Sequence, residues 1–360
     1  MEPADTEDVA ERYARFAERE TSHHSEVMQA WAFGVSIDPT VIGLIETLPS
    51  RERQPNLVFA AARVADPDLV DPHQLQARDD EYQLFRASLL AHWDRIRAIT
   101  ARRHTQTNEA GRLAVLLPAL HQIATETRRE LALIEVGASA GLTLHPHWWR
   151  YRYLRRDQRP ISEFGPTDRP AISVTVKDHA DHPDRDEVPP IRVPTQLPPI
   201  QWRLGVDLNP LDPTRRDDAQ WLRTLIWPGQ SHRLVRLDQA IDAAQHDPVL
   251  VLRHDITDPA AIDEVLRLVP RDYLPVIVHG AVLAYLSTVD RGDFAARMLA
   301  KVRAGQIRWV SNEGQFVVPQ IVEALDARPH FRRRLRRGSF VVSLDGQPLY
   351  QADGHASWVL

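Results

Sequence analysis

Five short apolar runs in the second half of the sequence each end in polar or charged residues. These endings occupy residues 135–141, 207–210, 254–256, 279–280 and 311–314. If the runs are parallel strands, their endings meet at one edge of a sheet, outside the carboxyl ends of the strands, where open α/β sheets bind ligands. The order of these endings therefore predicts one lined pocket.

The first three endings suit a nucleoside. Small residues at Gly137, Ser139 and Gly141 let the chain turn tightly and bring backbone N–H groups close to a ligand. Asp207 can accept hydrogen bonds from both hydroxyls of a ribose. Asp255, with the backbone of the following Ile256, can frame an adenine edge. We therefore expect an adenosine-shaped pocket; the alternative is a structural turn with ordinary helix caps at the two aspartates.

Two further strand endings supply candidate catalytic groups. A neutral imidazole at His279 could take a proton from a nucleophilic oxygen or nitrogen. Glu313, after the fifth run, is the other candidate base at this edge. The alternative for His279 is a structural histidine that is hydrogen-bonded at the end of a strand.

A dense polar cluster precedes the first of these runs. It consists of Gln106, Thr107, Asn108, Glu109 and Arg112, at the start of an expected helix. One interpretation is structural, with Thr107 or Asn108 as the helix cap and Glu109 near the positive end of the helix dipole. The other is that the cluster holds a substrate amine, with Glu109 as a catalytic group. The sequence leaves both open.

Arginines supply the candidate anion sites. Arg233 and Arg236 lie three residues apart on one expected helix face, where they could bind a carboxylate, sulfate or phosphate of a substrate. Surface ion pairs are the alternative. The basic run at residues 328–337 could dock an acidic carrier or partner protein.

The glycine loop also matches the pattern Gly-x-Ser-x-Gly of a nucleophile elbow. In that hydrolase alternative Ser139 is the nucleophile, and Asp255 with His279 or His355 completes a triad. The helical character of everything before residue 130 disfavours it, since an elbow follows several strands.

The pattern of apolar residues divides the chain into two parts. Residues 1–125 show helical spacing, with helices expected at 9–20, 38–48, 56–64, 80–100 and 109–125. Residues 126–360 alternate strands, at 131–136, 202–206, 249–252, 275–278, 307–310 and 340–344, with helices. This predicts an α/β fold with a largely parallel sheet and an α-helical N-terminal cap domain. A Pro-, Asp- and Arg-rich segment at about 152–199 is expected to be an insertion near the substrate side.

Composition excludes several classes of protein. Without cysteine, the chain has no disulfide, thiolate metal site or cysteine nucleophile. The net charge of −5 predicts neither nucleic-acid nor membrane binding. An acidic N-terminus and the lack of a long apolar stretch predict a cytoplasmic protein. Histidine spacing predicts no metal, and the His- and Asp-rich residues 178–187 are expected to be a solvated loop.

The motif Glu135-x-Gly137-x-Ser139-x-Gly141, followed by Gly-Val-Asp207-Leu-Asn-Pro, resembles the class I S-adenosylmethionine-dependent methyltransferases. The resemblance implies a Rossmann-like fold in which 135–141 meets the methionine part, Asp207 the ribose and Asp255 the adenine. Two departures stand out. Ser139 replaces the usual central glycine, and Asp207 lies 72 residues after Glu135, against about 20 expected.

Over nearly its whole length the chain also resembles the actinobacterial domain-of-unknown-function family 2332. The matching stretches include 54–57, 106–109, 116–120, 135–142, 205–212, 221–222, 227–228 and 233–237. This resemblance implies an uncharacterised family with some relatives linked to aziridine formation in natural-product biosynthesis. The sequence therefore predicts a small-molecule transferase that uses S-adenosylmethionine; the alternative is cofactor-independent ring closure by an amine, with loss of sulfate or phosphate.

Overall fold

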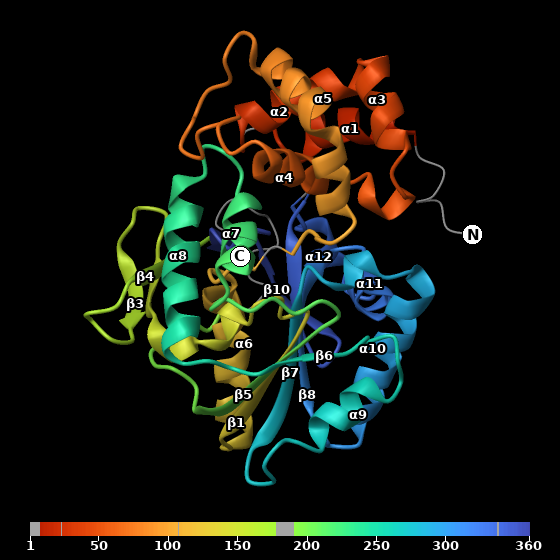
Figure 1. Cartoon of the computed structure of the whole chain (residues 1–360). Coiled ribbons are helices and arrows are strands. Elements are labelled where there is room, and N and C mark those ends of the chain that lie inside the picture. The colour runs from red at the N-terminus through yellow and green to blue at the C-terminus, as the bar shows by residue number, and fades with distance from the viewer. Residues whose placement is uncertain (1–7, 23, 107, 178–190, 337) are drawn as a thin grey trace. The chain divides into compact units, whose positions relative to one another are not determined.

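The computed structural model describes residues 8–22, 24–106, 108–177, 191–336 and 338–360. They form two compact units (Figure 1). Unit 1 comprises Met1–Thr107 and Asp212–Asp238, and unit 2 comprises Asn108–Leu211 and Gln239–Leu360. The long helix α8 (Ser231–His246) begins in unit 1 and ends in unit 2.

Unit 1 is helical. Its helices are α1 (Val9–Arg19), α2 (Glu26–Ser36), α3 (Pro39–Glu46), α4 (Pro55–Ala65), α5 (Glu81–Thr100) and α7 (Arg216–Thr224). Side chains of Asp8, Ser25 and Asp38 accept hydrogen bonds at the starts of the first three, as helix-capping residues do. The predicted helices near 9–20, 38–48, 56–64 and 80–100 are confirmed, whereas α2 was not predicted.

An aromatic cluster forms the core of unit 1. Trp31 and Phe85 stack with their ring centroids 4.7 Å apart, and Phe59 meets both rings edge-on. All three side chains are fully buried. Such ring pairs add stability beyond the apolar area that they bury.

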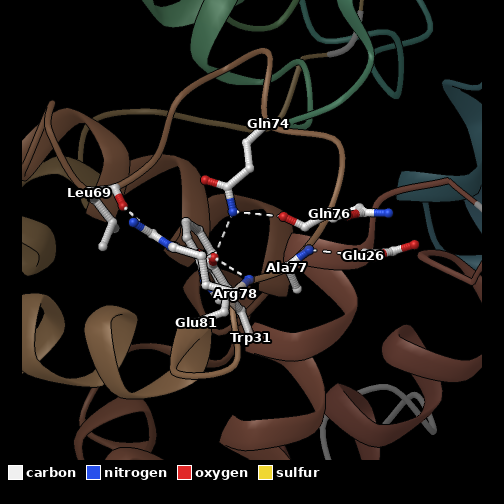
Figure 2. Close-up of polar contacts among 8 residues, drawn as sticks. All are labelled: Glu26, Trp31, Leu69, Gln74, Gln76, Ala77, Arg78 and Glu81. Atoms are coloured by element: carbon white, nitrogen blue, oxygen red, sulfur yellow. Dashed lines mark hydrogen bonds and ion pairs between the residues drawn. The ribbon is translucent and has the colours of Figure 1, made fainter.

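A buried carboxylate ties the chain before α5 to this core (Figure 2). Glu81 accepts hydrogen bonds from the indole of Trp31 (3.1 Å), the amide of Gln74 (2.7 Å) and the guanidinium of Arg78 (2.9 Å). Arg78 also donates to the carbonyl of Leu69 (3.1 Å). Because the charge is buried and well hydrogen-bonded, it fixes this segment.

The described residues of unit 2 form one mixed sheet of eleven strands in the order β3-β2-β4-β11-β10-β9-β8-β7-β1-β5-β6. The strands are β1 (Leu131–Val136), β2 (Arg150–Leu154), β3 (Pro160–Phe164), β4 (Ala171–Val176), β5 (Ile200–Asp207), β6 (Val251–Arg253), β7 (Leu274–Gly280), β8 (Arg308–Gly314), β9 (Phe340–Leu344), β10 (Gln347–Ala352) and β11 (Trp358–Val359). The core from β6 to β8 is parallel throughout. Numbered along the chain, its strands lie in the order 3-2-1-4-5.

The helices of unit 2 cover both faces of this sheet. They are α6 (Arg112–Thr127), α9 (Ala261–Leu266), α10 (Thr288–Arg303), α11 (Pro319–Asp326) and α12 (Pro329–Arg333). On one face, Ile134 and Trp309 share a core with Phe294 of α10. On the other, the hydroxyl of Tyr350 donates to the carbonyl of Val115 in α6 (2.6 Å). The expected α/β class with a mostly parallel sheet is thereby confirmed.

The segment at about 152–199 was expected to be an insertion near the substrate side, but in the structure it adds strands to the sheet. Its described part contributes β2, β3 and β4, which extend the sheet at the edge opposite β6. In β2 the alternating Tyr151 and Tyr153 are buried. The motif at residues 178–187 lies outside the described residues.

Within the described ranges, no single helix is long and apolar enough to cross a membrane. One bent pair, α2 and α3 at 89°, has the length and apolar composition of a membrane span when its two helices are taken together, and only by these two criteria.

Candidate functional site

The loop after β1 has an alternating left-handed backbone. The φ angles are +73° at Gly137, +52° at Ser139 and +70° at Gly141. Only glycine adopts this region without cost, so Ser139 is strained by about 1–2 kcal/mol. The amides of Gly137 and Ala138 both donate to the carbonyl of Val206 in β5 (2.8 and 3.1 Å), which holds the loop against the neighbouring strand.

Asp207, the last residue of β5, closes this loop. One carboxylate oxygen accepts the Ser139 amide (2.8 Å), and the other accepts the Asn209 amide (2.7 Å). The 72-residue separation from Glu135 is therefore bridged in space, because β1 and β5 are adjacent strands. The predicted pairing of the glycine loop with the acid after the second core strand is present in the structure.

The polar cluster before α6 reaches the same loop. The side-chain amide of Asn108 donates to the carbonyl of Ala138 (2.6 Å), and α6 has no side-chain cap at its start. The capping interpretation is therefore wrong for Asn108; Thr107 lies outside the described residues. Arg112 donates to the carbonyl of Gly280 (3.0 Å), at the end of β7. Glu109 is buried and accepts the Gly111 amide (3.1 Å).

Glu135 is the most perturbed acid of the site. It is 9% exposed, and burial raises its pKa to about 8, against the lowering effects of the Thr143 hydroxyl and the Arg112 guanidinium and with a smaller raising effect of Asp207. Its Oε2 has no hydrogen-bond partner of normal geometry among the described residues. A carboxyl in this state can exchange a proton near neutral pH.

Buried polar atoms without a partner among the described residues gather around these strand ends. They are Glu135 Oε2, Ser139 Oγ, Ser311 Oγ, Asn312 Oδ1, Glu313 Oε2 and Ser343 Oγ. Buried polar groups are nearly always hydrogen-bonded in folded proteins. These unpartnered atoms occur on both faces of the sheet, with Glu135 and Asn312 on the α6 face and Ser311 and Glu313 on the α10 face beside His279.

His279 and Glu313 lie on the other face of the sheet. The indole of Trp309 donates to Nε2 of His279 (3.0 Å), so the imidazole proton is on Nδ1 and faces Glu313 Oε1 (2.8 Å). The imidazole also packs on Phe294 of α10, whereas Glu135 lies on the α6 side. Because both ring nitrogens of His279 are engaged, this geometry favours the structural alternative over proton transfer.

Glu313 Oε1 accepts two further hydrogen bonds, from the backbone amides of Val282 and Leu283 (3.0 and 3.1 Å). The turn after β7 is therefore fixed to the end of β8. Val282 in turn packs on Gly137, where an added Cβ would lie 1.9 Å from its Cγ2.

The third predicted acid has local partners. Asp255 is exposed, and its Oδ1 accepts hydrogen bonds from the amide (2.9 Å) and the hydroxyl (2.7 Å) of Thr257. The carbonyl of Ile256 accepts from Arg297 (2.8 Å). The hydrogen bonds of Asp255 form a local turn, and Asp255 does not cap α9, whose N-cap is Ala260 without a side-chain hydrogen bond; the capping alternative is therefore wrong for Asp255.

Three predicted substrate-binding residues belong to unit 1: Gln106, Arg233 and Arg236. Arg233 is buried and donates to the side chain of Gln230 (2.7 Å). Within unit 2 the structure brings together Asn108, Arg112, Glu135, Ser139 and Asp207.

Sequence reasoning missed Asn312 and Thr143 as site residues. Both are buried. Asn312 follows a predicted strand and Thr143 follows the glycine loop, and these positions in the sequence could have identified them. The hydrolase alternative gains no support, because no histidine of the described residues reaches the Ser139 hydroxyl. In the same residues no group of three or more His, Cys, Asp or Glu side chains could hold a metal.

These features define an α/β protein with a polar site at the carboxyl edge of a mostly parallel sheet. The chain belongs to the DUF2332 family of uncharacterized proteins conserved in bacteria, whose family model matches residues 10–360. This confirms the family expected from the sequence. No curated protein matches the chain.

Proposed function

We propose that unit 2 is a small-molecule transferase of the class I methyltransferase type that binds S-adenosylmethionine at the carboxyl ends of β1, β5 and β6. The hydrogen bond from the Ser139 amide to Asp207 carries this proposal, because it brings the glycine loop and the candidate ribose-binding acid together. The strand order supports it as well. The order reverses beside β1, and nucleotides bind α/β sheets at such a switch point.

Of the residues Gly137, Ser139 and Asp207, the last two fit this cofactor. Ser139 adopts the backbone conformation of a glycine, so the loop keeps its shape, and its buried hydroxyl can donate to a ligand. Asp207 is half-buried and accepts one backbone amide on each oxygen, and a carboxylate can accept hydrogen bonds from ribose hydroxyls. Gly137 fits less well, because Val282 fills the space beside its α-carbon.

S-adenosylmethionine, when bound, supplies a methyl group activated by a positively charged sulfur. Glu135 is assigned to an ammonium group of the ligand, because a carboxyl with a pKa of about 8 loses its proton when a cation approaches. Glu109 remains the candidate base for the acceptor. His279 and Glu313 are assigned to positioning, since their hydrogen bonds hold the turn after β7.

A second candidate is cofactor-independent ring closure. In this reaction a substrate amine attacks a neighbouring carbon, the bond from that carbon to a sulfate or phosphate breaks, and a carboxylate accepts the amine proton. The packing of Val282 on Gly137 favours it, because this contact uses space next to the glycine loop. Glu135 would then be the proton acceptor.

Calorimetric titration of the full chain with S-adenosylmethionine and S-adenosylhomocysteine tests the first proposal. Micromolar binding is expected, and Asp207→Asn should weaken it at least about tenfold, because a hydrogen bond to a charged group contributes roughly 1.5–3 kcal/mol. A melting temperature close to wild type would show that the variant is folded.

Asp157→Asn is the matched control. Asp157 also accepts a backbone amide, that of Arg159 (3.1 Å), but it lies in the turn between β2 and β3. The affinity of the Asp157→Asn variant for S-adenosylmethionine should equal that of the wild type. Absence of binding, or equal binding by Asp207→Asn, would reject the cofactor and leave ring closure as the better proposal.

A further inference from the structure

Unit 1 contains a cavity of its own, separate from the site in unit 2. It has a volume of about 440 Å³ and is lined by α4, α5 with the residues that follow it, and α7. The lining residues are Val64, Arg95, Ala98, Ile99, Arg102, Arg103, Asp217, Gln220 and Trp221. This volume lies within the range of small-molecule sites, about 300–1,000 Å³.

The charged side chains at this cavity have a net positive charge. Arg103 forms an ion pair with Asp218 (2.6 Å), and Asp217 lines the wall beside Arg95 and Arg102. Three guanidinium groups and one carboxylate thus line the cavity, and Asp218 neutralises Arg103 from outside the lining. An exposed guanidinium next to apolar walls favours a ligand that carries a single negative charge.

Arg102 is the group best placed to receive that charge. Its guanidinium is exposed and has no hydrogen-bond or ion-pair partner in the described part of the chain. Arg95 donates only one bond, to the carbonyl of Ala65 (3.0 Å), and keeps further N–H groups for a ligand. Both residues therefore have donors to offer at the mouth of the cavity.

Apart from Gln220, the remaining walls are apolar, and they include an aromatic ring held in place. Trp221 is buried, its indole donates to the carbonyl of His104 (3.0 Å), and the Arg103 guanidinium lies 5.8 Å from the ring centroid. Ile99 and Ala98 of α5 complete this wall. A fixed indole among aliphatic side chains suits a flat apolar group.

We propose that this cavity binds a small organic anion, in which a carboxylate, sulfonate or phosphate is attached to a flat apolar body. The anionic group contacts Arg102 and Arg95, and the apolar body lies against Trp221 and Ile99. The site belongs to unit 1 alone, so it stands whether or not unit 2 is a transferase.

Calorimetric titration of the full chain with 2-naphthoate tests this. The acid should bind with a Kd of roughly 1 mM or tighter. The neutral 2-naphthamide lacks the charge and acetate lacks the flat body, so each should bind at least about tenfold more weakly. Equal affinity for the amide or for acetate, or no binding of the acid, overturns the proposal.

Substitutions locate the binding. Arg102→Gln should weaken 2-naphthoate about tenfold, and Ala98→Glu, which adds a carboxylate to the wall, should abolish binding. Arg97→Gln is the matched control, because Arg97 lies on α5 outside the cavity lining and pairs with Asp94 (3.5 Å). Melting curves establish that each variant is folded. If Arg102→Gln and Ala98→Glu both bind like the wild type, the anion binds elsewhere and the proposal is wrong.

Discussion

The backbone amide of Ser139 donates a hydrogen bond of 2.8 Å to the carboxylate of Asp207, and this bond joins the loop after β1 to the end of β5. The same carboxylate accepts the Asn209 amide. One side chain therefore fixes both loops that would border a nucleotide. A loop held in place before binding lowers the ordering entropy that binding must overcome.

Ser139→Gly should stabilise the protein. The change removes a left-handed non-glycine residue, which costs about 1–2 kcal/mol, and a buried hydroxyl without a partner. The added freedom of glycine in the unfolded chain offsets about 0.5–1 kcal/mol. We expect the free energy of unfolding in urea to rise by about 1 kcal/mol.

Ser139→Ala is the control, because it removes the hydroxyl but keeps the strained backbone. It should gain less than Ser139→Gly. A loss of stability in the glycine variant would mean that the hydroxyl is hydrogen-bonded in solution.

Gly137→Ala should destabilise unit 2 strongly. An alanine Cβ would lie 1.9 Å from Cγ2 of Val282, and the backbone has a φ of +73°. We expect a loss of about 3 kcal/mol or more in urea unfolding, from steric overlap added to backbone strain. Adding Val282→Ala should restore part of the loss.

Gly305→Ala separates the two effects. Gly305 has a similar φ of +69°, but nothing lies within 4 Å of the added Cβ. Its cost should be about 1 kcal/mol, that of the backbone alone. Equal losses in the two alanine variants would show that Val282 does not pack on Gly137.

Much of the fold could be predicted because its signals are local. The apolar run at Leu131–Val136 and the Asp38-Pro39 helix start are read directly from residue types. The strands β2 and β4 were missed although Arg150–Leu154 and Ala171–Val176 alternate in polarity. The many prolines and charges around them outweighed that alternation.

The arrangement of the site was harder to predict. Glu135 and His279 both end buried strands, yet they lie on opposite faces of the sheet. Central parallel strands are apolar on both faces, so they show no alternation that would fix which way a side chain points. The positive φ of Ser139 likewise depends on the packing of the whole loop. The residue type alone does not indicate it.

Glu81→Gln should destabilise unit 1. The carboxylate is 1% exposed and accepts bonds from Trp31, Gln74 and Arg78, whereas a glutamine turns an NH₂ group toward these donors. We expect a loss of about 2 kcal/mol in the free energy of unfolding, below the 3–5 kcal/mol of a fully buried pair because Arg78 is partly exposed.

Glu26→Gln is its control. Glu26 is exposed and accepts only a long hydrogen bond of 3.4 Å from the Ala77 amide, so its loss should stay under about 0.5 kcal/mol. Tryptophan fluorescence during urea unfolding measures both variants. Similar losses would mean that the hydrogen bonds of Glu81 drawn in Figure 2 contribute little to stability.

Glu135 should make unit 2 less stable as pH rises. Burial raises its folded-state pKa to about 8, against about 4.3 in an unfolded chain. Between these values the folded protein binds more protons than the unfolded chain, so the free energy of unfolding falls with rising pH and levels off above about pH 8. Glu135→Gln, a neutral mimic of the protonated acid, should remove this slope.

We therefore expect Glu135→Gln to match the wild type near about pH 4.5 and to exceed its unfolding free energy by about 2 kcal/mol or more near about pH 8.5. Urea unfolding across this range measures the difference. Glu130→Gln is the control, since Glu130 is exposed just before β1 and accepts a hydrogen bond from Gln201 (3.1 Å). Its curve should run parallel to that of the wild type. If the curve of Glu135→Gln does so too, the carboxyl of Glu135 is ionised at neutral pH, and its assignment to a ligand ammonium loses its physical basis.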